Sequence, residues 1–203
     1  MNRSMKWTIL PLLFGGSLLA QELTPVQFKR LCETSPMNTF TLTAPTKILG
    51  TAPTVTTIDT PCRINFATGS KLEADQSAFA FAGPLVFQAG PNAEVTLVKS
   101  FFEAPSIQIT EGISSSLILS ESSVKANAGN ITIALGANGQ VNASLPYAMM
   151  RNALEAAGSI SISGGARATF SLQSTNAIAG AAINLNFAGT EGTLALQDSI
   201  VNA

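Results

Sequence analysis

The stretch "GSISISGGARATFSLQSTNAIAG", residues 158–180, alternates branched apolar residues with small polar ones and is interrupted by glycines. Successive side chains of a β-strand point to opposite faces, so Ile160 and Ile162 share one face of a first strand. Phe170 and Leu172 share one face of a second strand in the same way. The pattern returns about 22 residues later, and this repeat predicts short stacked strands joined by bends.

Five blocks of the chain align with one another from residue 85 onward, and each block holds three apolar pairs at i, i+2 spacing. The first pairs are Leu85/Phe87, Ile107/Ile109, Ile131/Ile133, Ile160/Ile162 and Ile183/Leu185. The second pairs are Val95/Leu97, Leu117/Leu119, Val141/Ala143, Phe170/Leu172 and Leu194/Leu196. The third pairs are Phe102/Ala104, Val124/Ala126, Leu154/Ala156, Ala177/Ala179 and Val201/Ala203. Upstream, Phe40/Leu42 and Ile64/Phe66 are expected to be the first pairs of two earlier blocks.

The connections between these pairs have nearly constant lengths. Seven residues separate the first and second pairs in four blocks, eight in the last, and every such connection contains glycine. We expect a bend with positive φ there, which glycine adopts most readily. Three strands per block with one side always apolar predict a parallel coil, in which each strand pairs with its equivalent one block later, about 4.8 Å away.

With this pattern the chain resembles the right-handed parallel β-helix proteins of the pectin-lyase-like superfold, which also occurs in filamentous-haemagglutinin-type adhesins and autotransporter passengers. The resemblance covers about residues 39–203 and rests on the repeat length and the apolar columns. It implies an all-β fold, a single-stranded right-handed parallel β-helix of about six to seven rungs with a short N-terminal capping helix. It also implies a secreted or cell-surface protein of the bacterial envelope, with the outer membrane as one location.

The N-terminal residues predict two further segments. Arg3 and Lys6 precede a short apolar run that ends near Ala20, which reads as a signal peptide over residues 1–20, with a buried or membrane-anchoring helix as the alternative. Residues 21–38 form the cap: Thr24 is the expected helix N-cap and Pro25 the first helical residue. The apolar residues expected to close the end of the coil are Leu23, Val26, Phe28 and Leu31.

Cys32 and Cys62 are the two cysteines of the chain. In a protein exported to an oxidising compartment they are expected to form a disulfide, with two buried thiols as the alternative. The disulfide would tie the cap to an early rung.

The charge pattern excludes several classes of function. Removing residues 1–20, which hold two of the eleven basic residues and none of the twelve acidic ones, leaves a net charge of −3. Few and scattered basic residues argue against a nucleic-acid partner, and the mature chain shows no membrane span. The chain contains no histidine, so imidazole serves neither as base nor as metal ligand. We expect no catalytic residue, no metal and no cofactor.

Three sets of polar residues are candidates for catalytic groups. A recurring hydroxyl follows the second pair in four blocks, namely Ser100, Ser122, Thr175 and Ser199, and the expectation is that it bonds to neighbouring backbone. Glu103 is expected to form a cross-rung ion pair with Lys125. Glu73 and Asp75 are the carboxylates on which a calcium or acid–base site of a polysaccharide enzyme would depend; the alternative is a charged, solvated rim.

Two surface features carry the functional hypothesis. The outward positions of the first strands form an uncharged polar face that is expected to bind a partner through Gln88, Gln108, Thr110, Thr132, Ser161, Ser163, Asn184 and Asn186. Residues 146–157 lengthen one circuit and predict a short helical insertion, whose Tyr147, Met149 and Met150 are either core cover or a partner contact.

These features predict a structural or adhesive surface protein, whose partner is a glycan or a surface protein. The last rung has no predicted cap, so end-to-end stacking through it is a further possibility. Two alternatives remain: a polysaccharide lyase or glycoside hydrolase of the β-helix type, and the N-terminal part of a longer autotransporter-like passenger.

Overall fold

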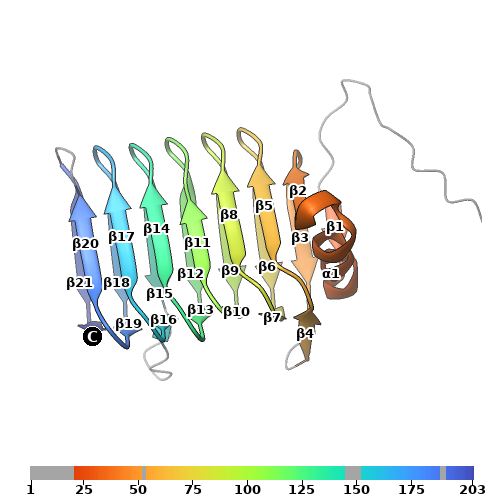
Figure 1. Ribbon diagram of the computed structural model, residues 1–203. Coiled ribbons are helices and arrows are strands. Elements are labelled where there is room, and N and C mark those ends of the chain that lie inside the picture. The colour runs from red at the N-terminus through yellow and green to blue at the C-terminus, as the bar shows by residue number, and fades with distance from the viewer. Residues whose placement is uncertain (1–20, 52–53, 145–151, 188–190) are drawn as a thin grey trace, which may run out of the picture.

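Each repeat of the chain forms one turn of a parallel β-solenoid of about seven turns, shown side by side in Figure 1. The structure is a computed structural model that describes residues 21–51, 54–144, 152–187 and 191–203. Three sheets run along the solenoid, and in all of them every strand pairs in parallel with its equivalent in the neighbouring turn. This confirms the predicted parallel stacking and the expected number of rungs.

Sheet 1 collects the first strand of each turn. Ile107 lies opposite Leu85 and Ile131, and Ile160 lies opposite Ile131 and Ile183, as the alignment of first pairs predicts. The two earlier pairs are also in register, with Phe40 opposite Ile64. Its strands are β2 (Thr39–Leu42), β5 (Cys62–Phe66), β8 (Leu85–Ala89), β11 (Ile107–Thr110), β14 (Ile131–Leu135), β17 (Ile160–Gly164) and β20 (Ile183–Phe187).

Sheet 2 collects the second strands and confirms the second column of pairs. Leu117 lies opposite Val95 and Val141, and Phe170 lies opposite Val141 and Leu194. The sheet begins with β1, a strand that the sequence pattern did not indicate. This strand precedes the helix in the chain and pairs with β3. Its strands are β1 (Gln21–Leu23), β3 (Thr46–Leu49), β6 (Lys71–Asp75), β9 (Glu94–Val98), β12 (Ser116–Ser120), β15 (Gln140–Ser144), β18 (Thr169–Gln173) and β21 (Thr193–Gln197).

Sheet 3 collects the third strands and corrects one prediction. Residues 152–156 form strand β16, so the expected helix over residues 146–157 is wrong for this part; residues 145–151 lie outside the described residues. The pairing shifts by one residue between Asn152 and Leu154, and the bulge buries Ala153 as well as Leu154. Its strands are β4 (Val55–Ile58), β7 (Ala78–Phe81), β10 (Phe101–Ala104), β13 (Ser123–Ala126), β16 (Asn152–Ala156), β19 (Asn176–Ala179) and β22 (Ile200–Asn202).

The inward side chains of all three sheets form one continuous apolar core. Near the N-terminal end the core is aromatic: the ring of Phe79 lies 4.9 Å from that of Phe28 and 5.2 Å from that of Phe102. Toward the middle the core consists of aliphatic residues such as Ile131 and Leu154, both fully buried. Stacking of equivalent positions therefore buries side chains that a single turn would leave exposed.

The helix α1 (Pro25–Thr34) covers the N-terminal end of the core, as Figure 1 shows. Thr24 is its N-cap and its hydroxyl accepts a hydrogen bond from the Gln27 amide, which confirms the predicted start. Phe28 is fully buried and Leu31 packs against the core. Val26 was expected to close the end as well but is 58% exposed, because it lies on the outer side of the helix. A short 3-10 helix, η1 (Pro36–Asn38), leads into β2.

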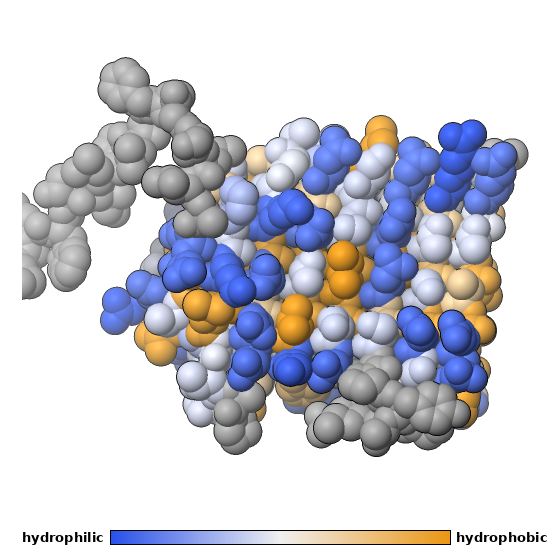
Figure 2. All heavy atoms as spheres, turned by 180° about the vertical axis from the view of Figure 1, so that it is seen from behind, coloured by the Kyte–Doolittle hydropathy of each residue, from blue (hydrophilic) through white to orange (hydrophobic). Residues whose placement is uncertain are grey.

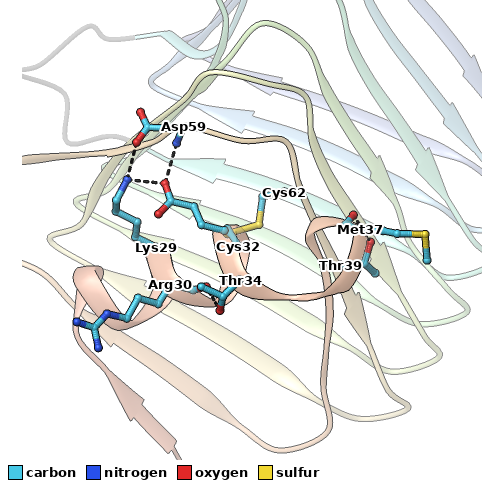
Figure 3. The surroundings of a disulfide bond; sticks show 9 residues. Lys29, Arg30, Cys32, Thr34, Met37, Thr39, Asp59 and Cys62 are labelled. Carbon is cyan, nitrogen blue, oxygen red and sulfur yellow. Dashed lines mark hydrogen bonds and ion pairs between the residues drawn. A yellow bond between two sulfur atoms is a disulfide. The ribbon is translucent and has the colours of Figure 1, made fainter. Parts of the chain in front are cut away.

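Cys32 of α1 and Cys62 of β5 form a disulfide, which confirms the expected link between the cap and an early rung (Figure 3). Both cysteines are buried. Beside the disulfide, the Lys29 ammonium forms ion pairs with Glu33 and with Asp59, the latter at 3.0 Å. The helix is thus held by the apolar core, by a covalent link and by charges at its rim.

The corners between sheets use glycine for a different reason from the one expected. Positive φ falls on residues such as Asn92, Ser114 and Asn138, and Gly69 is the one glycine of the described residues with positive φ. A Cβ on Gly112 would instead lie 2.6 Å from the carbonyl carbon of Gly90. The glycines are needed because the backbones of successive corners pack directly on one another.

The apolar core reaches the surface at the last turn. Leu194 and Leu196 occupy inward positions of β21 but are 46% and 45% exposed, because no further strand of the described residues covers them. Figure 2 shows apolar atoms at this end of the molecule, on the right. End-to-end stacking through this turn stays a prediction.

Candidate functional site

The outward side chains of sheet 1 form the polar face predicted from the sequence, which we call the polar ladder. It consists of two parallel columns over the five strands from β8 to β20, and pairing in register fixes both columns. Gln88, Gln108 and Thr132 are exposed, whereas Thr110 and Ser161 are half-buried. The ladder residues are Gln88, Gln108, Thr110, Thr132, Ser161, Ser163, Asn184 and Asn186.

Val86 and Ala134 occupy the two remaining positions of these columns. Neither column contains a charged residue between β8 and β20. Parallel strands are about 4.8 Å apart, so the amides and hydroxyls recur at that spacing along the molecule. The arrangement provides hydrogen-bond donors and acceptors without a proton-transfer group or a nucleophile activated by a base.

A hollow lies at the N-terminal end of the ladder, where sheet 1 turns toward sheet 2. Its volume is about 250 Å³, and it is lined by Asn65, Phe66, Gln88, Ala89 and Gly90. The Oδ1 atom of Asn65 is buried and accepts no hydrogen bond from the described residues. Arg63 donates a long hydrogen bond of 3.5 Å to Oε1 of Gln88. An acceptor without a donor beside an open hollow is a feature that the sequence pattern did not reveal.

The recurring hydroxyls are structural, as expected. Oγ of Ser100 accepts the backbone amide of Ser77, and Oγ of Ser122 accepts that of Ser100, at 3.0 and 2.9 Å. Oγ of Ser199 likewise accepts the amide of Thr175. These hydroxyls are engaged with backbone groups of the neighbouring turn, so they are not placed to act as nucleophiles. Their role is to stabilise the sharp corner between sheets 2 and 3.

The carboxylates considered for catalysis lie on sheet 2, at its N-terminal end. Glu73 forms an ion pair of 2.7 Å with Lys47 on the neighbouring strand, and Glu94 pairs with Lys71 at 3.2 Å. The hydrogen bond from Lys47 to Glu73 raises the pKa of the Lys47 ammonium. Asp75 lies on the same strand as Glu73. The residues that the structure describes contain no group of three or more acidic or cysteine side chains able to hold a metal ion.

The predicted ion pair between Glu103 and Lys125 is wrong in its partner. The two residues are neighbours across β10 and β13, but the Lys125 ammonium pairs at 3.0 Å with Glu155 of the following strand. Glu103 instead accepts a hydrogen bond from Asn127. The long side chain of Lys125 can reach the strand on either side, so strand register alone does not predict which of the two glutamates it pairs with.

Glu111 is the residue whose environment sequence reasoning missed. It lies in the corner after β11, is 5% exposed, and neither carboxyl oxygen has a hydrogen-bond partner among the described residues. Burial raises the pKa of this carboxyl to about 8. The alignment could have indicated this burial. Glu111 occupies the same position after its first strand as the apolar residues Ala89 and Leu135 occupy in the neighbouring turns.

Tyr147, Met149 and Met150, the other predicted partner contacts, lie outside the described residues. Within those residues, no helix combines the length and the apolar character needed to cross a membrane. Comparison with known proteins finds no matching family model, no matching curated protein and no matching solved structure. The polar ladder and the hollow beside it are therefore the candidate functional site on their geometry alone.

Proposed function

We propose that this chain is a secreted or cell-surface structural protein with an adhesive face, and that the polar ladder contacts the partner. The proposal depends on one observation, the in-register repetition of amides and hydroxyls over five adjacent strands. A rigid sheet holds these groups at fixed spacing, so a partner with matching periodic groups binds without ordering a loop.

The chemistry of the ladder suits a glycan. Uncharged amides and hydroxyls both donate and accept hydrogen bonds, as sugar hydroxyls do. The hollow at the end of the ladder is lined by Gln88, whose exposed amide can donate to and accept from sugar hydroxyls. A surface protein is the other partner that such a face would accept, and the experiment below separates the two.

The disulfide supports a location outside the reducing cytosol. Cys32 and Cys62 are linked, and disulfides form and persist mainly in oxidising compartments. The signal peptide predicted over residues 1–20 would deliver the chain there. Placement in the bacterial envelope and its outer membrane is part of the same proposal.

A polysaccharide-cleaving enzyme is less well supported by the geometry. Its acid–base residues would be acids such as Glu73 and Asp75 of β6, and the Glu73 carboxylate is paired with the Lys47 ammonium. The polar ladder itself contains no carboxylate or lysine. A passive binding face therefore explains more of the described surface.

A glycan array tests the proposal, with matched variants on two faces of the solenoid. Thr132→Arg places a long charged side chain at the centre of the ladder, on an exposed position that tolerates it. Ser171→Arg on β18 places the same side chain on the outward face of sheet 2 and is the control. We expect the wild-type chain and Ser171→Arg to bind the same glycans, and Thr132→Arg to lose at least tenfold in affinity.

Equal loss in both variants, or retained binding by Thr132→Arg, contradicts the role of the ladder. Absence of glycan binding by the wild-type chain, together with ladder-dependent capture of a purified surface protein, would assign the other partner. Absence of both would contradict the proposed adhesive function.

A further inference from the structure

The corner that contains Glu111 is fixed through its backbone but not through its carboxyl group. The Glu111 amide donates to the carbonyl of Ala134 at 2.7 Å, and its own carbonyl accepts from Gly136 at 3.0 Å. The side chain points into the core and is 5% exposed. Both carboxyl oxygens are buried without a donor among the described residues. A buried carboxyl group without hydrogen-bond partners destabilises the fold even when it is neutral, and it destabilises the fold far more when it is ionised.

The surroundings of Glu111 offer no counter-ion. Strands β8, β11, β12, β14 and β15 contain no ionisable residue, and neither do residues 112–115 and 135–139. Glu94 at the start of β9 is paired with Lys71. Across the core, Glu103 and Lys125 occupy outward positions of sheet 3. The raised pKa of the Glu111 carboxyl, about 8, accordingly has burial as its cause.

The same corner is joined to the preceding one by a small set of contacts. Oγ of Ser115 donates to the carbonyl of Gly90 at 2.8 Å and accepts the amide of Ala93 at 3.2 Å. Gly112 packs on Gly90 too closely for any side chain. Ile113, which follows Gly112, is 57% exposed, so the chain reaches solvent two residues after the buried carboxyl.

We propose that Glu111 is a proton-controlled latch for the corner formed by residues 111–115. With the carboxyl neutral, the corner stays closed on the core. When the carboxyl gives its proton to solvent, the anion has no partner inside and moves to water, and the corner opens with loss of the Ser115 contacts. This inference does not depend on the proposed binding function of the ladder.

The direction of the pH effect follows from linkage. The closed state holds the proton more tightly than the opened state, where the carboxyl has its ordinary pKa near 4.5. The difference in proton affinity therefore stabilises the closed corner fully below pH 4.5, and this stabilisation is lost as the pH rises to about 8. Between pH 6 and pH 9 the opening equilibrium constant is expected to rise on the order of a hundredfold.

Amide hydrogen exchange at pH 6 and pH 9, corrected for the intrinsic rate, measures this opening. The reporting amides are those of Gly136 and Ser116, which bond to Glu111 and to Ala93 across the corners. In the wild-type chain we expect their protection to fall on the order of a hundredfold between the two values. In Glu111→Gln and Glu111→Leu we expect no pH-dependent change. Glu121→Gln, at an exposed corner, is the control and should behave as wild type.

Three outcomes would overturn the latch: equal corrected protection at both pH values in the wild type, a pH dependence that survives in Glu111→Gln, or an equal loss of protection in all turns. Glu111→Leu keeps the test decisive if Glu111→Gln fails to fold, because Leu135 already fills the equivalent position one turn later. Titration of the wild-type glutamate carboxyls by carbon NMR provides a separate readout, and an ordinary pKa for Glu111 would equally exclude the proposal.

Discussion

The hydroxyl oxygen of Ser122 accepts a hydrogen bond of 2.9 Å from the backbone amide of Ser100, one turn earlier in the solenoid. Ser100 does the same for Ser77 at 3.0 Å. Each of these serines follows a residue with positive φ, Lys99 or Glu121, at the sharp corner between sheets 2 and 3. The hydroxyl replaces a backbone acceptor that the bend removes, so the hydrogen bonding between successive turns continues around the corner.

Replacing Ser100 by alanine should therefore destabilise the fold by about 2 kcal/mol, because the buried Ser77 amide loses its acceptor. Ser100 is also within hydrogen-bonding distance of the carbonyls of Ala74 and Val98. Ser199→Ala, in the more exposed last turn, is the control and should cost less than half as much. Urea unfolding measures both, and equal losses would show that burial of the Ser77 amide is not the cause.

Removing the disulfide should destabilise the protein by about 3–4 kcal/mol, from the closure entropy of a 30-residue loop. The double variant Cys32→Ala, Cys62→Ala is compared with the wild type under oxidising and reducing conditions. We expect reductant to lower the wild-type unfolding midpoint to near that of the double variant and to leave the latter unchanged. An unaltered wild-type midpoint in reductant would mean that the core and the Lys29 ion pairs hold the cap without it.

Gly112→Ala should destabilise the fold by about 2–3 kcal/mol through overpacking. The new Cβ would lie 2.6 Å from the carbonyl carbon and 2.7 Å from the carbonyl oxygen of Gly90, and backbone atoms move at a higher cost than side chains. Gly129→Ala is the matched control, because its nearest contact would be 3.1 Å. Thermal unfolding checks the order of the two variants, and a larger effect at Gly129 would refute the close stacking of corners.

Phe79→Ala should be the most damaging of these substitutions, with a loss of about 3–5 kcal/mol. The ring is fully buried and joins α1 to the core through Phe28, at 4.9 Å between ring centroids. Val55→Ala, at a 51% exposed position of β4, is the control and should change stability little. Circular dichroism with urea measures both, and a small effect of Phe79→Ala would mean that the cap packs independently of this ring.

The register of the strands was predictable because two local properties define it. The alternation of apolar and polar residues assigns each side chain to a face, and the constant length between apolar pairs assigns each pair to a turn. Ile107, Ile131 and Ile160 were therefore aligned correctly without coordinates. The helix start at Thr24 follows from local sequence, and the Cys32–Cys62 pairing was predicted from the expected export of the chain.

Other features depended on neighbours that the repeat does not identify. Lys125 lies directly between Glu103 and Glu155 in register, but its ammonium pairs with Glu155, whereas Glu103 accepts a hydrogen bond from Asn127. Residues 152–156 have the composition of a helix but pair as a strand, because β13 and β19 on either side fix them in sheet 3. Tertiary pairing outweighs intrinsic propensity at such a position.

The sequence by itself determined the alternation, the length of the turns and the order of the strands, because these depend on the spacing of apolar residues along the chain. Only the tertiary structure decided that glycines serve close packing of corners, and that the Asn65 Oδ1 atom and the Glu111 carboxyl oxygens are buried without a donor among the described residues. The physical reason is that burial and hydrogen-bond satisfaction are properties of the space between turns, which contains atoms from residues at least 22 positions apart.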